Sequence, residues 1–285
     1  MLYGNCISFR ELRRVKILKE TGFDYVEVPL SPMHSAKKEE IEEFAEALEK
    51  EKMRCAAVNV LFPGDLRLTG KNAEPQKAGD YIEEIFEKTK SLKFEKVVFG
   101  SGGARKVPEG FGMEAAMGQI VKIIEDHLVP AAEKYGFAIA IEELNKGETN
   151  ILNSLAECAE LAKRINNPKV LLLADLYHIG MENDDLGQLP GYGGILAHCH
   201  IANPKDSRFY PQASDSPESI ALYKKFFSGL KSAGYGGGIS IEGNLGKIKD
   251  ISELPIPEWV GEDDRLFYAE SKKSLEFMRS IQKSN

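Results

Sequence analysis

The sequence lacks the features that would indicate a membrane, secreted or nucleic-acid-binding protein. No stretch approaches the roughly 20 apolar residues of a membrane span. The N-terminal segment, MLYGNCISFRELRRVK, has no apolar signal-peptide core. The net charge is −7, whereas proteins that hold nucleic acid by its phosphates usually carry a basic surface. We therefore expect a cytoplasmic protein that binds neither a membrane nor a nucleic acid.

Cysteine is scarce as well. The four cysteines, Cys6, Cys55, Cys158 and Cys199, form no CxxC pair. Each lies in or beside an apolar run, where cysteine packs as a small hydrophobic residue. The sequence therefore implies no disulfide framework, which agrees with a reducing compartment.

What is present is a regular alternation of short apolar runs with longer helical segments. Hydrophobic residues make up 42% and charged residues 28% of the 285 residues, which allows a large buried core without cross-links. Eight apolar runs predict strands, at Tyr3–Ser8, Tyr25–Pro29, Cys55–Leu61, Lys96–Gly100, Ala138–Glu142, Val170–Asp175, Leu196–Ile201 and Gly238–Glu242.

The segments between these runs have a helical period. Ile41, Phe44, Ala45 and Leu48 follow one another at i, i+3, i+4 and i+7, and Glu and Lys fill the opposite face. Eight strand–helix units with apolar strands indicate a parallel sheet covered by helices, which at this length closes into a barrel. We predict an α/β fold, a single (β/α)8 TIM barrel domain over residues 1–285. An open doubly wound sheet is disfavoured because no Gly-rich dinucleotide loop follows the first run.

Ionisable residues mark the carboxyl ends of the last four predicted strands. Glu142, Asp175 and Glu242 end strands five, six and eight, while His198 and His200 lie in strand seven. Catalytic groups of such barrels sit at this end. Three carboxylates meeting there would repel one another, and a divalent cation would relieve that repulsion. Three oxygen ligands and one imidazole suit Mn²⁺ best, with Mg²⁺, Co²⁺, Fe²⁺ or Zn²⁺ as alternatives.

Three neighbouring features have less specific patterns. Arg105 and Lys106 belong to a small Gly-containing basic loop, which could hold a phosphate or carboxylate or simply be solvated. His198 should lie one layer deeper than His200 and support it. Glu143 should point to the other side of its strand and form a structural salt bridge.

The chain resembles the xylose isomerase-like TIM barrel superfamily, in the branch of sugar phosphate isomerases/epimerases and ketose 3-epimerases. The matching motifs are E-x-L-N-x-x-E-T at Glu142–Thr149, D-x-x-H at Asp175–His178, H-x-H at His198–His200 and the closing segment Gly237–Gly243. The run VVFGSGGARKVP at strand four is also typical of this group. The resemblance covers nearly the whole chain, and the motifs follow in the family's order.

The resemblance assigns roles to individual residues. It implies one set of metal ligands, namely Glu142, Asp175, His200 and Glu242. It also implies that Glu148 and His178 contact substrate hydroxyls. Arg208 matches a substrate-binding arginine less closely, because its spacing from His200 is slightly longer than the family's pattern.

These groups suit proton transfer beside a carbonyl. A metal bridging the carbonyl and a neighbouring hydroxyl would stabilise the enediolate, while Glu142 and Glu242 take and return the proton. We therefore expect a metal-dependent isomerase or epimerase of a small carbohydrate, free or phosphorylated. The sequence does not decide between aldose–ketose isomerisation and ketose 3-epimerisation. It also leaves open whether the barrels form a homo-oligomer.

Other functions remain as alternatives. A lyase or dehydratase acting on an inosose or keto-glycoside would start with the same proton abstraction. An endonuclease IV-like DNA-repair enzyme shares the fold, but its three zinc ions need many histidines and this sequence has five. A non-catalytic sugar-binding barrel would not require all four ligands.

Overall fold

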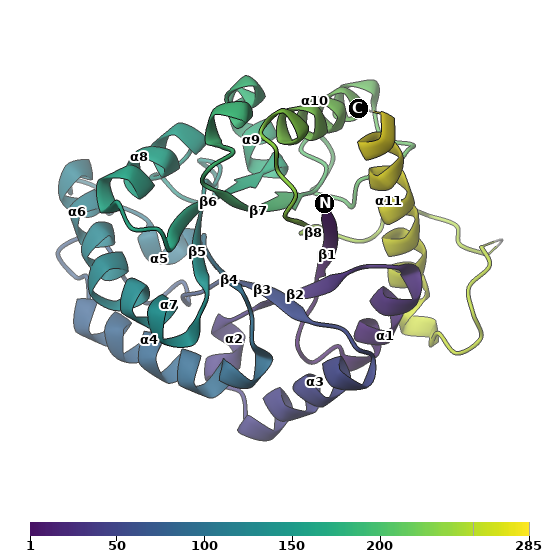
Figure 1. The fold of residues 1–285 in the computed structure, drawn as a ribbon, viewed down its shortest axis with the longest axis horizontal. Helices are drawn as coiled ribbons and strands as arrows, with labels where there is room; N and C mark the ends of the chain where they lie inside the picture. Colours follow the sequence, from purple (N-terminus) through teal and green to yellow (C-terminus); the bar gives the residue numbers. More distant parts are fainter. Residues whose placement is uncertain (253, 285) are drawn as a thin grey trace.

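The computed structural model describes residues 1–252 and 254–284, and within them eight parallel strands close into a barrel. The strands follow one another in chain order, and β8 pairs with β1 to close the ring (Figure 1). Their bounds are β1 Leu2–Cys6, β2 Tyr25–Pro29, β3 Cys55–Asn59, β4 Lys96–Phe99, β5 Ala138–Glu142, β6 Val170–Asp175, β7 Leu196–Ile201 and β8 Gly238–Ile241. The predicted (β/α)8 barrel is confirmed.

Helices form a layer outside the barrel (Figure 1). Their bounds are α1 Leu12–Thr21, α2 Ser31–His34, α3 Lys38–Lys50, α4 Pro75–Thr89, α5 Gly102–Arg105, α6 Met113–Ile123, α7 Val129–Tyr135, α8 Leu155–Ile165, α9 Leu176–Glu182, α10 Pro217–Ser232 and α11 Arg265–Ser284. None of the helices in the described part of the chain combines the length and hydropathy needed to cross a bilayer.

Helix α8 illustrates how local sequence sets these elements. The Ser154 hydroxyl accepts a hydrogen bond from the Glu157 backbone N–H, which satisfies a free donor at the start of the helix. Leu155, Cys158 and Leu161 then form its buried face. Asn166 adopts a left-handed conformation and ends the helix.

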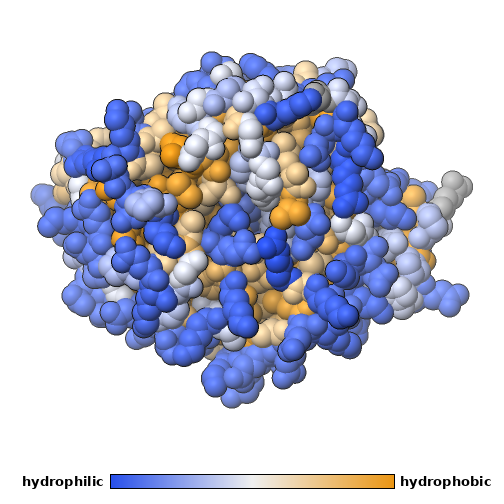
Figure 2. All heavy atoms as spheres, in the orientation of Figure 1, coloured by the Kyte–Doolittle hydropathy of each residue, from blue (hydrophilic) through white to orange (hydrophobic). Residues whose placement is uncertain are grey.

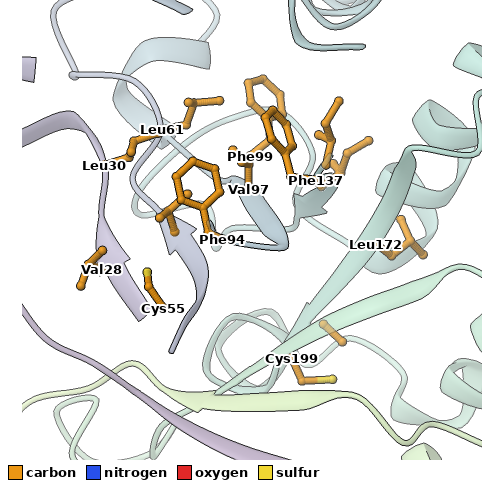
Figure 3. Packing of buried hydrophobic residues seen from close by; sticks show 14 of the residues in the cluster. Val28, Leu30, Cys55, Leu61, Phe94, Val97, Phe99, Phe137, Leu172 and Cys199 are labelled. Atoms are coloured by element: carbon orange, nitrogen blue, oxygen red, sulfur yellow. The ribbon is translucent and has the colours of Figure 1, made fainter. Parts of the chain in front are cut away.

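The hydrophobic core has two unequal parts. The larger part lies between the strands and the helices, and Figure 3 shows some of it, with Val28, Val97 and Leu172 contributed by β2, β4 and β6. The smaller part is a separate cluster of Val98, Ala140 and Leu173. These three alternate along their strands with residues of the larger part, so they lie inside the barrel. Figure 2 looks along the barrel onto one of its ends, where hydrophilic residues lie around the edge and apolar residues show between them nearer the middle.

Tyr25 fills the lower end of the barrel interior. A Cβ atom at Gly4 would lie 2.1 Å from the Tyr25 ring, and one at Gly238 would lie 2.6 Å from its hydroxyl. Both distances are shorter than any real contact, so β1 and β8 need glycine where the ring crosses them. The Tyr25 ring therefore closes this end of the barrel, and the polar side chains of the interior lie between it and the mouth.

Candidate metal centre

Four ionisable side chains meet inside the barrel mouth, each from a different strand. Glu142 ends β5, Asp175 ends β6, His200 lies in β7 and Glu242 directly follows β8. One ligand atom from each of the four lies within 4.8 Å of the others. The structure thus brings together the four residues that the sequence predicts as metal ligands.

His200 lies among the three carboxylates. Its Nδ1 atom is 3.0 Å from Glu142 Oε1, 3.4 Å from Glu242 Oε2 and 3.9 Å from Asp175 Oδ2. The Oδ1 atom of Asp175 accepts a hydrogen bond from the Tyr177 backbone N–H, at 2.7 Å, at the start of α9. Its Oδ2 atom is buried and has no hydrogen-bond partner among the described residues.

A buried carboxylate oxygen without a hydrogen-bond partner is costly, and here it faces three other ligand atoms. A divalent cation would satisfy that oxygen and neutralise the clustered charge. Three carboxylates and one imidazole form an oxygen-rich set that suits Mn²⁺ or Mg²⁺. The residues therefore fit the predicted metal.

The two glutamates of the cluster differ in their electrostatics. Burial raises the pKa of Glu142, and the nearby His200 imidazole offsets this effect only in part. Burial also opposes ionisation of Glu242, but the charge and hydrogen bond of His200 and the charge of Arg208 lower its pKa to about 2. Without an ion, the two carboxyl groups therefore differ in how readily they lose a proton.

Close packing and one amide support the two glutamates. The Asn59 side chain, at the end of β3, donates a 2.7 Å hydrogen bond to Glu242 Oε1. This contact leaves Glu242 Oε2 to face the cluster. Beside Glu142, a Cβ atom at Gly100 would lie 2.1 Å from Oε2, so glycine at this position makes room for the carboxylate.

Sequence reasoning missed Asn59 and also Glu27. Glu27 lies in β2, is fully buried and accepts hydrogen bonds from the side chains of His198 and His200. Asn59 and Glu27 are each a polar residue within an otherwise apolar predicted strand, and this pattern is the sequence signal that could have identified them. His198 is buried beneath His200, as expected of a supporting histidine.

Three of the residues predicted to bind substrate lie beside the cluster or its ligands. Arg208 forms an ion pair with Glu242 Oε2 through Nη2, and its Nη1 atom lies 3.4 Å from Glu148 Oε1. His178 is buried, with Nε2 3.5 Å from Asp175 Oδ2. Its Nδ1 atom accepts from the Asn145 backbone N–H, so Nε2 carries the ring hydrogen. Arg208 and His178 therefore border the metal cluster, and Glu148 is linked to it through Arg208.

Arg208 lies in the loop after β7, which is hydrogen-bonded to the loop after β8. The Asn244 backbone N–H donates to Arg208 O at 2.8 Å, and the Tyr210 backbone N–H donates to Asn244 O at 3.2 Å. Ser207 and Arg208 both have positive φ angles, of 50° and 54°. Such strain costs about 1–3 kcal/mol per residue and is typical of functional sites.

The structure corrects the prediction for Arg105. This side chain is fully buried, and its guanidinium donates to the backbone carbonyls of Phe99, Glu142 and Leu152 at 3.0, 2.8 and 3.4 Å. It therefore has no surface with which to contact substrate. Its place beneath the β4 and β5 ends makes it a support for the strand that carries Glu142.

Glu143 also differs from expectation. It is buried, but among the described residues it forms no salt bridge, and instead its Oε1 atom accepts from the Asp175 backbone N–H at 2.7 Å. Burial raises the pKa of this carboxyl group well above its ordinary value. A buried acid with one hydrogen bond links β5 to β6 here, in place of the predicted ion pair.

Known proteins resemble this chain over its whole fold. A family model described as a xylose isomerase-like TIM barrel matches residues 15–267. The 3-dehydro-D-guloside 4-epimerase of Escherichia coli K12 is 27% identical over 128 residues, which are 44% of this chain and 46% of the relative. The D-psicose 3-epimerase of Ruminiclostridium cellulolyticum is 24% identical over 161 residues, 53% of this chain and 50% of the relative. The chain thus matches about half the length of these curated relatives.

A solved structure extends the likeness to the complete barrel. The D-psicose 3-epimerase from Clostridium cellulolyticum H10, crystallised with D-tagatose, superposes with a TM-score of 0.79. The superposition covers 99% of both chains at 17% sequence identity. At this level of identity the superposition shows a shared fold.

Proposed function

Because the chain belongs to the xylose isomerase-like TIM barrel family, we propose that it is a divalent-metal-dependent isomerase or epimerase of a sugar or sugar phosphate. One observation carries the proposal: Glu142, Asp175, His200 and Glu242 meet at the ends of four adjacent strands. The two curated relatives described above are both epimerases, which supports the same class of reaction. We also propose that residues 1–285 form one domain and that the protein acts in the cytoplasm.

The proposed reaction moves a proton at a carbon beside the substrate carbonyl. Glu142 and Glu242 are the pair that takes and returns this proton. They project from β5 and β8, with β6 and β7 between them, so they border the cluster at separate positions. Return of the proton to the opposite face of the same carbon gives an epimer, and return to the neighbouring carbon gives the isomeric sugar.

The remaining groups hold the ion and the substrate. A divalent ion, which we expect to be Mn²⁺, would stabilise the negative charge of the enediolate oxygens. Asp175 and His200 mainly hold this ion. His178 would donate its Nε2–H to a substrate hydroxyl, while Arg208 and Glu148 would bind other hydroxyls at the rim.

Adding Mn²⁺ to the metal-free protein is expected to raise its melting temperature. At a concentration of 100 times Kd, binding to the folded state adds about 2.7 kcal/mol, or roughly 5 °C for a chain of this size. Thermal unfolding measures the shift, and elemental analysis should find one ion per chain. The proposal would be contradicted if the protein held no ion and showed no thermal shift with Mn²⁺. About three zinc ions per chain would favour the endonuclease alternative.

Turnover in D₂O is expected to place deuterium on the carbon beside the substrate carbonyl. The reason is that a carboxyl group that takes a proton exchanges it with solvent before returning one. Ketoses, ketose phosphates, inososes and keto-glycosides form the test panel, with products analysed by NMR. A product that forms without deuterium at this carbon would exclude the enediolate route, and elimination products would favour the lyase alternative.

A further inference from the structure

Glu27 is a carboxylate buried directly beneath the metal cluster. It is the third residue of β2, and its side chain is 0% exposed. Its Oε1 atom lies 2.8 Å from His200 Nε2. Its Oε2 atom lies 2.7 Å from His198 Nε2 and accepts from the Ser240 hydroxyl at 2.6 Å. Both oxygens of Glu27 are therefore occupied by inward-facing side chains of β7 and β8.

His200 uses its two ring nitrogens for different purposes. Nδ1 faces Glu142, Asp175 and Glu242, whereas Nε2 faces Glu27 alone among these carboxylates. A ring nitrogen binds a metal through its lone pair, so Nδ1 must be free of hydrogen when an ion is bound. The remaining ring hydrogen then belongs on Nε2, where it needs an acceptor.

From this geometry we propose that Glu27 is a positioning residue, which fixes His200 as a metal ligand through Nδ1. The inference rests on the proposed function, because it concerns the ion that the four ligands would hold. A carboxylate accepts but does not donate, so Glu27 keeps the hydrogen on Nε2 and the lone pair on Nδ1. Its bond also fixes the plane of the imidazole ring, which aims that lone pair at the cluster.

A second group of ligand atoms, from Cys6, Glu27 and His200, also lies close together. An ion there would need the lone pair of His200 Nε2. If the first site also held an ion on Nδ1, the imidazole would have to lose both of its ring hydrogens. Loss of both hydrogens is unfavourable for an imidazole, so we assign the ion to the first group and to Glu27 the role of accepting a hydrogen bond from His200.

Glu27 is itself fixed by contacts that reach the lower end of the barrel. Because the Ser240 hydroxyl donates to Glu27, it accepts from the Tyr25 hydroxyl, which lies 3.0 Å away. Tyr25 packs against Gly4 and Gly238, with no room for a Cβ atom at either position. The orientation of His200 is thus determined by packed groups and not by the ion alone.

The test compares Mn²⁺ affinity in three variants by titration calorimetry. Loss of such a supporting group typically weakens metal binding about 10- to 100-fold. Glu27→Gln keeps an acceptor oxygen but loses the charge, so we expect a loss near 10-fold. Glu27→Ala removes the acceptor, so we expect its loss of Mn²⁺ affinity to approach 100-fold. Glu270→Gln is the matched control, because Glu270 is equally buried in α11 but its carboxylate accepts from the backbone N–H groups of Gly246 and Ile248 and from no metal ligand, so the Mn²⁺ affinity of this variant should stay within twofold of wild type.

Affinities within twofold of wild type in both Glu27 variants would overturn the proposal. Thermal unfolding without metal shows whether each variant folds. If Glu27→Ala does not fold, the Mn²⁺ affinity of Glu27→Gln decides the test alone. Excess Mn²⁺ should restore activity to Glu27→Gln, which would not occur if the variant were merely misfolded.

A spectroscopic measurement separates this inference from the proposed function. In metal-free protein labelled with ¹⁵N-histidine, the Nε2–H proton of His200 should give a slowly exchanging low-field signal. The signal should weaken in Glu27→Gln and disappear in Glu27→Ala. If wild-type protein bound no Mn²⁺, the proposed function would fail, but the signal would still support the hydrogen bond between His200 and Glu27. If the signal were absent from wild-type protein, the inference about Glu27 would be overturned.

Discussion

Replacing Glu242 by glutamine is expected to lower turnover about 10³- to 10⁴-fold. The substitution keeps the size of the side chain and removes its charge. In the folded protein Glu242 faces the cluster with one oxygen and accepts from Asn59 with the other, so its placement is fixed. The variant would lose one half of the acid/base pair together with one metal ligand.

The measurement is kcat on a substrate identified in the D₂O panel, at saturating Mn²⁺. Saturating metal separates the loss of proton transfer from the loss of metal affinity, which calorimetry reports independently. Glu270→Gln provides the same chemical change at a buried carboxyl that contacts the backbone of Gly246 and Ile248 and none of the four ligands. Turnover within tenfold of wild type in Glu242→Gln would remove Glu242 from the acid/base pair.

Replacing Arg105 by alanine is expected to lower the free energy of unfolding by about 4 kcal/mol. The guanidinium is fully buried and donates to three backbone carbonyls, those of Phe99, Glu142 and Leu152. Each carbonyl left without a donor costs about 1–3 kcal/mol. Chemical denaturation of the metal-free protein measures the change.

Lys106→Ala is the control for this experiment. Lys106 is the next residue in the same loop and is exposed, so its loss should change stability by less than about 0.5 kcal/mol. If Arg105→Ala were as stable as Lys106→Ala and instead showed a raised KM, the substrate contact predicted from the sequence would be right after all.

The fold and the four ligands could be predicted because both depend on local pattern. Strand bounds at β2, β5, β6 and β7 agree with the apolar runs, and the other four differ only at their ends. In a parallel barrel all strands end at the same mouth, so polar residues at consecutive strand ends must lie close together. No knowledge of long-range contacts was needed.

The residues that hold the ligands in place could not be predicted, because they depend on contacts between distant parts of the chain. Glu27 in β2 meets His198 and His200 in β7, and these strands are not neighbours. The substrate contact predicted for Arg105 is wrong for a related reason. The sequence of a short basic loop does not show which way its side chains point. The helix α5, Gly102–Arg105, turns this residue beneath the strand ends.

The backbone bonds between Asn244 and the segment that carries Arg208 have a consequence for recognition. They make the arginine and Glu242 parts of one rigid unit, so both are already placed before a sugar arrives. Such preorganisation lowers the entropy lost on binding, because no loop has to be ordered around the ligand. The Asn244 side chain also donates to Ser207 O at 2.8 Å, so it helps to fix the segment that carries Arg208. Selectivity among sugars would then depend on the fixed shape of this rim, and exchange of Asn244 would change which hydroxyl patterns are accepted although Asn244 itself contacts no hydroxyl.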